Sequence, residues 1–119
     1  MDSKQFGKHG EGLAADFLKK EGYEILGRNY RKRGGEIDII AFDPSHREIV
    51  FVEVKSRRNR AFGGPEEAIS DQKIRKMAET AELWLSENGK EKEEWRVDLI
   101  GIESSRHGKY EIAHWTNIS

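Results

Sequence analysis

The stretch that decides the fold runs from residue 36 to residue 55: EIDIIAF at 36–42, DPSHR at 43–47 and EIVFVEVK at 48–55. Two runs rich in β-branched residues flank a polar segment that contains Pro44, a pattern typical of two strands joined by a hairpin turn. We therefore expect an antiparallel pair of strands at 36–42 and 48–55, with side chains alternating between the two faces of each strand.

The segments around this hairpin predict two helices and three more strands. Apolar residues at helical spacing predict helices over 5–21, which Gly22 would end, and 71–87, which Ser70 would cap. Aromatic and β-branched runs predict the remaining strands, at 23–30, 95–102 and 110–115. Residues 60–69 read as a loop.

The order of these elements, α-β-β-β-α-β-β, predicts an α/β fold with a mixed central sheet flanked by helices. The first three strands are joined by connections too short for crossovers, so we expect an antiparallel meander. The second helix is long enough to carry a parallel crossover to the fourth strand. Residues 1–119 are expected to form one domain.

Composition narrows the class of protein. The chain contains no cysteine, which excludes disulfides, thiolate metal sites and cysteine nucleophiles and fits the reducing cytoplasm, where we expect the protein. No apolar stretch approaches the roughly 20 residues of a membrane helix, so no membrane partner is expected.

The net charge of −1 conceals two basic segments, RNYRKR at 28–33 and KSRRNR at 55–60, which hold eight of the 21 lysines and arginines. They indicate either a face that binds a phosphate backbone or a solvated surface of mixed charge.

Carboxylates interrupt the apolar pattern of the central hairpin. Alternation places Glu36 and Asp38 on one face of the first strand, with Ile37 and Ile39 on the other. On the second strand, Glu53 and Lys55 share a face with Ile49 and Phe51, so acidic groups from both strands are expected to converge at one end of the sheet.

Carboxylates among so many apolar residues are costly if buried and unpaired. They are therefore open to solvent, paired with cations as in a Glu53–Lys55 salt bridge, or ligands of a metal. Mg²⁺ or Mn²⁺ suits oxygen ligands, and a neighbouring lysine suits phosphodiester chemistry, since it stabilises developing negative charge.

Asp38 followed by Glu53-Val54-Lys55 resembles the PD-(D/E)xK nuclease signature, with Ile37 in place of the proline. The longer pattern is similar to the bacterial YraN-like family, also called UPF0102, a predicted endonuclease-like family related to Holliday-junction resolvases. Three stretches carry this resemblance: HGEGLAADFLKKEGYEILGRNYRKRGGEIDIIAFD, FVEVKSR and FGGPEEAISDQKIRKMAETAELWL. It implies a restriction-endonuclease-like domain.

The resemblance also implies roles at the site. Asp38 and Glu53 match metal-binding carboxylates, and Glu11 matches the acidic residue that completes the metal site in the resolvases. Lys55 matches the catalytic lysine. Glu36 is either a further metal-site residue or a partner of one, and the implied cofactor is Mg²⁺ or Mn²⁺. Glu11 and Glu36 also have ordinary alternatives, as a solvent-facing helix residue and as part of the Gly34-Gly35 turn.

Candidate nucleic-acid-binding residues come from the basic segments and from the resemblance. They are Arg31, Arg33, Arg57, Arg58, Lys73 and, from a glutamine found in related nucleases, Gln72. Each is otherwise an ordinary surface residue.

The sequence thus predicts a metal-dependent endonuclease that hydrolyses phosphodiester bonds in DNA. By analogy with the resolvases, the substrate would be structured or branched DNA. A homodimer is among the expected partners, because an enzyme that cuts two strands needs two sites. Two alternatives remain open: a non-catalytic nucleic-acid-binding module with the nuclease fold, and an interaction or scaffold protein. The low net charge keeps both in play, since a general DNA binder is usually more basic.

Overall fold

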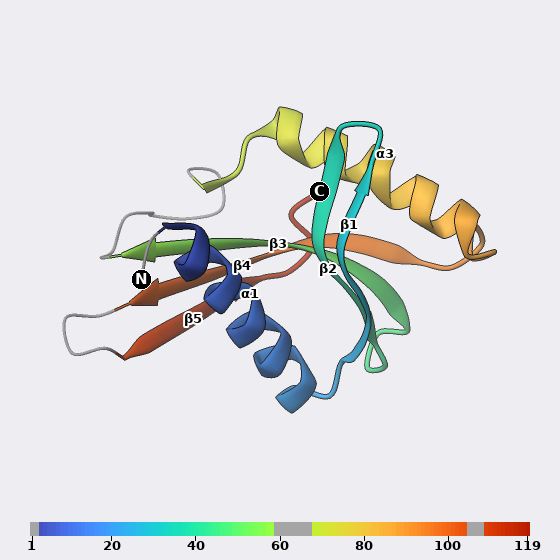
Figure 1. Cartoon of the computed structure of the whole chain (residues 1–119). Helices are drawn as coiled ribbons and strands as arrows, with labels where there is room; N and C mark the ends of the chain where they lie inside the picture. Colours follow the sequence, from blue (N-terminus) through green and yellow to red (C-terminus); the bar gives the residue numbers. More distant parts are fainter. Residues whose placement is uncertain (1–2, 59–67, 105–108) are drawn as a thin grey trace.

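The structure, a computed structural model, describes residues 3–58, 68–104 and 109–119, so most of the predicted 60–69 loop lies outside it. The predicted order of elements is confirmed (Figure 1). In chain order the elements are α1 (Ser3–Lys20), β1 (Glu24–Lys32), β2 (Gly35–Asp43), β3 (Glu48–Arg58), α3 (Asp71–Glu87), β4 (Trp95–Ser104) and β5 (Tyr110–Trp115).

The five strands form one mixed sheet in the order β1-β2-β3-β4-β5. The pairs β1–β2 and β2–β3 are antiparallel, which confirms the predicted meander. Strand β4 runs parallel to β3, as expected for a crossover through α3, and β5 returns antiparallel to β4. This α/β architecture agrees with that of a restriction-endonuclease-like domain.

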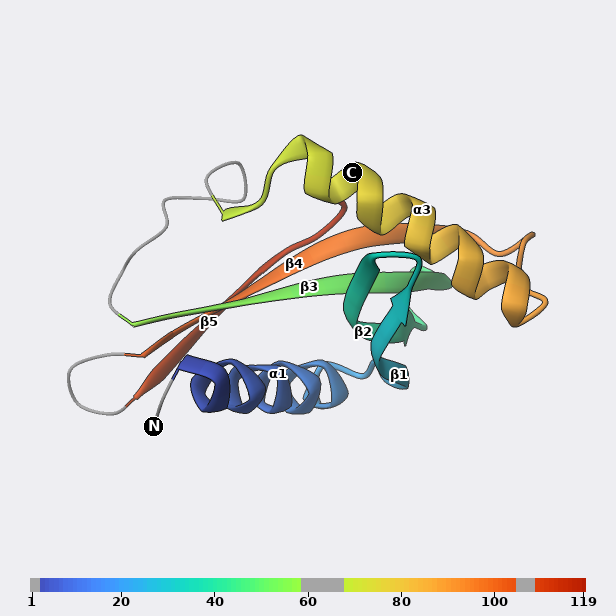
Figure 2. The ribbon, with the colours of Figure 1, turned by 45° about the horizontal axis from the view of Figure 1, so that its top comes forward.

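The two helices cover opposite faces of the sheet (Figure 2). Val50 and Val52 of β3 pack in a cluster with α1, whereas Ile49 and Phe51 pack in a cluster with α3. Burial of each such side chain contributes about 1.5–3 kcal/mol, so the alternation along β3 is what joins the three layers. Neither helix, in the part of the chain that is described, has the length and apolar character needed to cross a bilayer.

Glycine allows close approach of helix and sheet at two points. Gly10 of α1 lies against Ser56 of β3, and a Cβ there would stand 2.0 Å from the Ser56 Oγ. Gly35, at the start of β2, lies against Thr80 of α3, where a Cβ would stand 1.9 Å from the Thr80 Oγ1. Any side chain at either position would push the layers apart.

Strand β2 departs from the predicted alternation. Ile37 packs with the α3 cluster and Ile39 with the α1 cluster, so the prediction that they share a face is wrong. Pairing of β2 with β3 stops at Ile39 and Val52. On the other side of β2, Asn29 has a left-handed backbone with φ +55°, a conformation that asparagine tolerates better than most residues. The β1–β2 hairpin thus bends away from β3 beyond Ile39.

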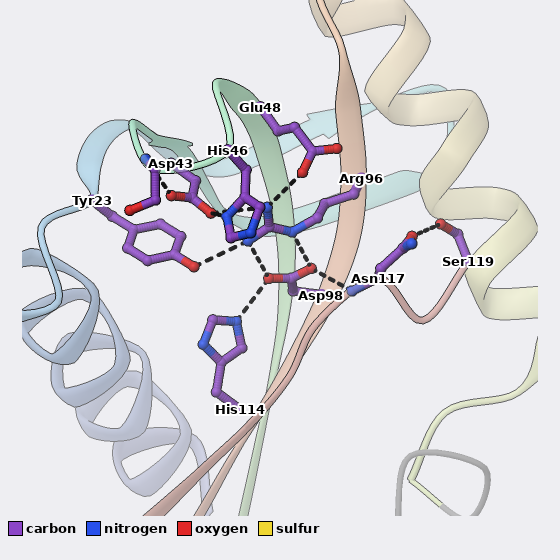
Figure 3. A network of polar contacts seen from close by, with 10 residues as sticks. Tyr23, Asp43, His46, Glu48, Arg96, Asp98, His114, Asn117 and Ser119 are labelled. Carbon is purple, nitrogen blue, oxygen red and sulfur yellow. Dashed lines mark hydrogen bonds and ion pairs between the residues drawn. The ribbon is translucent and has the colours of Figure 1, made fainter.

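A polar network centred on Arg96 connects the β2–β3 turn with β4 and β5 (Figure 3). The buried guanidinium donates to the carboxylates of Asp98 and Asp43, at 3.0 Å each, and to that of Glu48 at 2.9 Å. We call this the Arg96 network; its members are Tyr23, Asp43, His46, Glu48, Arg96, Asp98, His114 and Asn117.

Both buried aspartates of the Arg96 network are held ionised. Burial raises the pKa of Asp98, but hydrogen bonds with His114 and Arg96 outweigh burial and hold the pKa below its ordinary value. The same balance, with His46 and Arg96 as partners, lowers the pKa of Asp43. Because these charges are compensated inside the fold, the network is a structural feature, distinct from Asp38 and Glu53 at the other end of the hairpin.

Candidate active site

Asp38 lies where strands β2 and β3 diverge. Its Oδ2 accepts a hydrogen bond of 2.8 Å from the backbone N–H of Val54. The side chain thus takes a β3 amide that no backbone carbonyl of β2 reaches once the strands separate. The divergence of the two strands thus leaves the Val54 amide without a backbone partner on β2, and the hydrogen bond to this amide orients the Asp38 carboxylate.

Glu53 lies beside Asp38 on the α3 side of β3. Both residues are only 7% exposed, and their carboxyl groups share a hydrogen bond. Burial, and then the charge of Asp38, raises the pKa of Glu53 to about 7. Burial likewise raises the pKa of Asp38. The two carboxyl groups converge as the hairpin predicts, and each raises the cost of ionising the other.

Two lysines flank Glu53. The Lys55 Nζ lies 4.0 Å from its Oε1, and the Lys73 Nζ, from the first turn of α3, lies 3.6 Å from its Oε2. Both ammonium groups lower the pKa of Glu53, yet burial and Asp38 outweigh them. The salt bridge considered from the sequence therefore exists at long range, and it does not neutralise the carboxylate pair.

Glu11 and Glu36 stand beside this pair. Burial, and then Asp38, raises the pKa of Glu11, which lies partly buried on α1. Glu36 forms an ion pair of 3.2 Å with Arg31. Both glutamates line a pocket of about 590 Å³ between α1 and the β1–β2 hairpin. The four carboxylates predicted from the sequence are thus neighbours, two in the buried pair and two at the pocket.

The pair suits a hard divalent cation by its chemistry. Within residues 3–58, 68–104 and 109–119, no three carboxylate or histidine side chains lie close enough together to hold a metal ion by themselves. Mg²⁺, however, usually takes one or two protein carboxylates and completes its shell with water and substrate phosphate. Asp38 and Glu53 would supply those two carboxylates, and a bound cation would favour their ionised form, which burial disfavours.

The predicted nucleic-acid-binding residues are dispersed. Arg31 lies at the pocket beside Glu36, and Lys73 lies at Glu53, so these two flank the carboxylates from opposite sides. Arg33 occupies the β1–β2 turn, Arg57 pairs with Glu103 in the β3–β4 register, and Gln72 is exposed at the start of α3. The side chain of Arg58 lies outside the described part of the chain.

Sequence reasoning missed several residues around the carboxylates. Lys8, Arg28 and Asn29 line the pocket with Glu11 and Glu36. Arg28 belongs to a basic segment that the sequence singled out, but the left-handed backbone at Asn29 that orients the strand there has no reliable signal in a single sequence.

The family of the chain follows from comparison with known proteins. The family model of UPF0102, an uncharacterised protein family, matches residues 10–102. The chain belongs to the UPF0102 family. A UPF0102 protein of Pelobacter propionicus is 42% identical over 116 residues, covering 98% of this chain and 83% of that protein. A UPF0102 protein of Mycobacterium tuberculosis is 43% identical over 105 residues, covering 86% and 80%.

Among solved structures, this UPF0102 chain resembles SfsA of Pyrococcus furiosus, determined in complex with Ca²⁺. The TM-score is 0.38 and the identity 15%; the alignment covers 97% of this chain and 64% of the SfsA chain. A likeness of that extent has no bearing on the family assignment or on function.

Proposed function

We propose that this UPF0102 protein is a metal-dependent endonuclease that hydrolyses phosphodiester bonds in DNA. The observation behind the proposal is the buried Asp38–Glu53 pair, set where two strands diverge and flanked by Lys55 and Lys73. Perturbed carboxyl pKa values with a specific charged partner are characteristic of functional sites.

In this proposal Asp38 and Glu53, with Glu11 beside them, hold Mg²⁺ or Mn²⁺. When bound, such a cation activates water and stabilises negative charge on a phosphoryl group. The Val54 N–H fixes the Asp38 carboxylate, so this group needs no reorganisation during the reaction. Burial of the pair lowers the local dielectric and so strengthens electrostatic interactions within the site.

The lysines have separate roles in the proposal. The Lys55 side chain extends from the same face of β3 as Glu53, so its ammonium group is aimed at the phosphoryl oxygens of a substrate at the carboxylates. Lys73 approaches from α3, in the turn whose N-terminus is capped by Ser70. An ammonium group at that position suits a phosphate adjacent to the scissile one.

A module that only bound a phosphate backbone would gain nothing from this arrangement. Two buried carboxylates repel phosphate and cost desolvation energy, whereas a metal-dependent hydrolase requires both. The electrostatics therefore favour the nuclease over the binding module and over the scaffold protein.

The test is an assay of the purified chain on end-labelled four-way junction, flap, single-stranded and linear duplex DNA. We expect cleavage of at least one substrate with Mg²⁺ or Mn²⁺ and none with EDTA. Binding without cleavage, under every metal condition, would replace the nuclease by the binding module. If the protein neither binds nor cleaves any of these substrates, the remaining alternative is the interaction or scaffold protein.

A further inference from the structure

A groove runs from the carboxylates along the side of α1. It has a volume of about 590 Å³ and is lined by Gly7 and Lys8 of α1 and by Arg28, Asn29 and Arg31 of β1. We call it the α1–β1 groove. Glu11 and Glu36 close the end nearest the buried pair, because both interact with Asp38.

The local backbone gives the α1–β1 groove its basic wall. Strict alternation would turn Arg28 and Arg31 to opposite faces of β1. The left-handed Asn29, at φ +55°, interrupts that alternation, and all three residues line the groove.

The opposite wall of the groove, formed by α1, is open at Gly7. A Cβ at Gly7 would meet no atom within 4 Å, so the backbone of α1 is accessible to a ligand there. Lys8 follows at once and is exposed. The groove therefore has a cation on each wall and an open side at Gly7, which suits a chain of phosphates better than a compact anion.

The charges are ordered along the groove. The positive charges of Arg28 and Arg31 lower the pKa of Glu11, and Arg31 forms the ion pair with Glu36. The two carboxylates at the inner end are therefore partly compensated. The three cations exceed the two carboxylates by one. A phosphate strand would lie on the cations and reach the buried pair at the inner end.

The size of the groove selects among nucleic acids. Pockets of about 300–1,000 Å³ accommodate small ligands, which corresponds to about one or two nucleotides. A volume of about 590 Å³ therefore matches a short stretch of one strand, and the second strand of a duplex would have no place inside the groove.

We infer that the α1–β1 groove holds a single strand of DNA next to the phosphate to be cleaved. The protein would then act on single-stranded segments, such as flaps and unpaired branches. This rests on the proposed function for the identity of the ligand and deepens it by naming the substrate class.

The test measures fluorescence anisotropy of the full chain in EDTA, where hydrolysis does not occur. The probes are a labelled single strand of about 12 nucleotides and the duplex of the same sequence. We expect the single strand to bind at least about tenfold more tightly than the duplex. The Arg28→Gln/Arg31→Gln variant should lose about tenfold for the single strand, and its salt dependence should fall by about 1.4 in slope, for two lost phosphate contacts.

Two further variants keep the test decisive. Lys19→Gln/Lys20→Gln removes the same charge from exposed positions at the other end of α1 and should leave binding unchanged. Asn29→Gly keeps the left-handed backbone and should retain binding, whereas Asn29→Val should lose it, with thermal unfolding confirming that both fold.

Equal affinity for duplex and single strand, or wild-type binding by the Arg28→Gln/Arg31→Gln variant, would overturn the inference. Its failure and that of the proposed function are distinguishable. Cleavage that does not depend on the two arginines would reject the role of the α1–β1 groove and leave the nuclease proposal standing. Binding that depends on the groove, without cleavage, would reject the nuclease proposal and leave the role of the groove standing.

Discussion

At the scale of the residue, the pKa of Glu53 is set by opposing effects of burial and of neighbouring charges. Burial and the Asp38 charge raise its pKa, Lys73 and Lys55 lower it, and the first two win, which places the pKa at about 7. The ammonium groups have the smaller effect because they lie at 3.6 and 4.0 Å and belong to side chains partly in solvent, while the Glu53 side chain is 9% exposed. A group with this pKa changes charge near neutral pH.

Glu53→Gln should therefore change the pH dependence of stability. The pKa of Glu53 in the folded protein is raised above its ordinary value of 4.5, so the wild type loses stability as pH rises from about 4.5 to about 7. The variant does not ionise, so its free energy of unfolding should exceed that of the wild type by up to about 3 kcal/mol at pH 8. At pH 4 the two should agree, which urea unfolding measures.

The exposed Glu82→Gln on α3 is the matched control and should show no such trend. A Glu53→Gln variant that is equally stable relative to the wild type at both pH values would contradict the raised pKa.

Substitutions of the two lysines beside Glu53 should affect different kinetic constants. Lys55→Met should lower kcat by about 100-fold, because its ammonium is aimed at charge that develops in the transition state. Lys73→Met should mainly raise KM, since that side chain is assigned to an adjacent phosphate. Steady-state kinetics on the preferred DNA substrate measures both. Equal losses of kcat in the two variants would remove the distinction.

At the scale of the element, the β1–β2 hairpin determines the site. It stops pairing with β3 at Ile39 and is held against α3 by the contact of Gly35 with Thr80. An ion pair of 2.7 Å between Lys32 and Glu87, and a hydrogen bond from the Tyr30 hydroxyl to Glu87, fix its outer part to the same helix. The bend that leaves the Val54 N–H to Asp38 depends on these contacts.

Gly35→Ala should destabilise the protein by about 1–3 kcal/mol, because its Cβ would collide with the Thr80 Oγ1. Gly12→Ala, on α1 with no atom within 4 Å of the new Cβ, should instead stabilise by about 0.5–1 kcal/mol through helix propensity. Chemical unfolding of the two variants measures the difference. If Thr80→Ala does not restore part of the stability lost in Gly35→Ala, the collision is not the cause.

The elements were predictable from sequence because their signals are local. The apolar stripe at 71–87, its Ser70 cap and the β-branched runs at 36–42 and 48–55 give the helix and strands. The bend at Ile37 was not predictable, since alternation assumes that a strand stays paired along its length. The convergence of Asp38 and Glu53 followed from the hairpin, whereas the approach of Lys73 from α3 to Glu53 depends on tertiary packing.

At the scale of the whole molecule, charges are divided between two sites of opposite character. In the Arg96 network one guanidinium compensates buried carboxylates, and the pKa values of Asp43 and Asp98 are lowered. In the Asp38–Glu53 pair the carboxylates are undercompensated, and their pKa values are raised. The first arrangement stabilises the junction of β2, β4 and β5, and the second is the one that a cation or substrate would complete.

Arg96→Leu should destabilise the protein by about 3–5 kcal/mol, because Asp98 and Asp43 would remain buried without their cation. Lys92→Leu, at an exposed position before β4, should change stability by less than about 0.5 kcal/mol. Thermal and urea unfolding at pH 7 compare the two. A loss in Arg96→Leu no larger than that in Lys92→Leu would show that the network does not hold the strands together.

The central claim is that the Asp38–Glu53 pair hydrolyses DNA, and the most direct test compares two aspartate variants prepared identically. Asp38→Asn removes one charge from the pair, and Asp16→Asn removes one from an exposed position on α1. The rate constant for cleavage of the preferred substrate with Mn²⁺ is measured for each. We predict a loss of at least about 100-fold for Asp38→Asn and wild-type activity for Asp16→Asn. Equal cleavage by both variants would contradict the account.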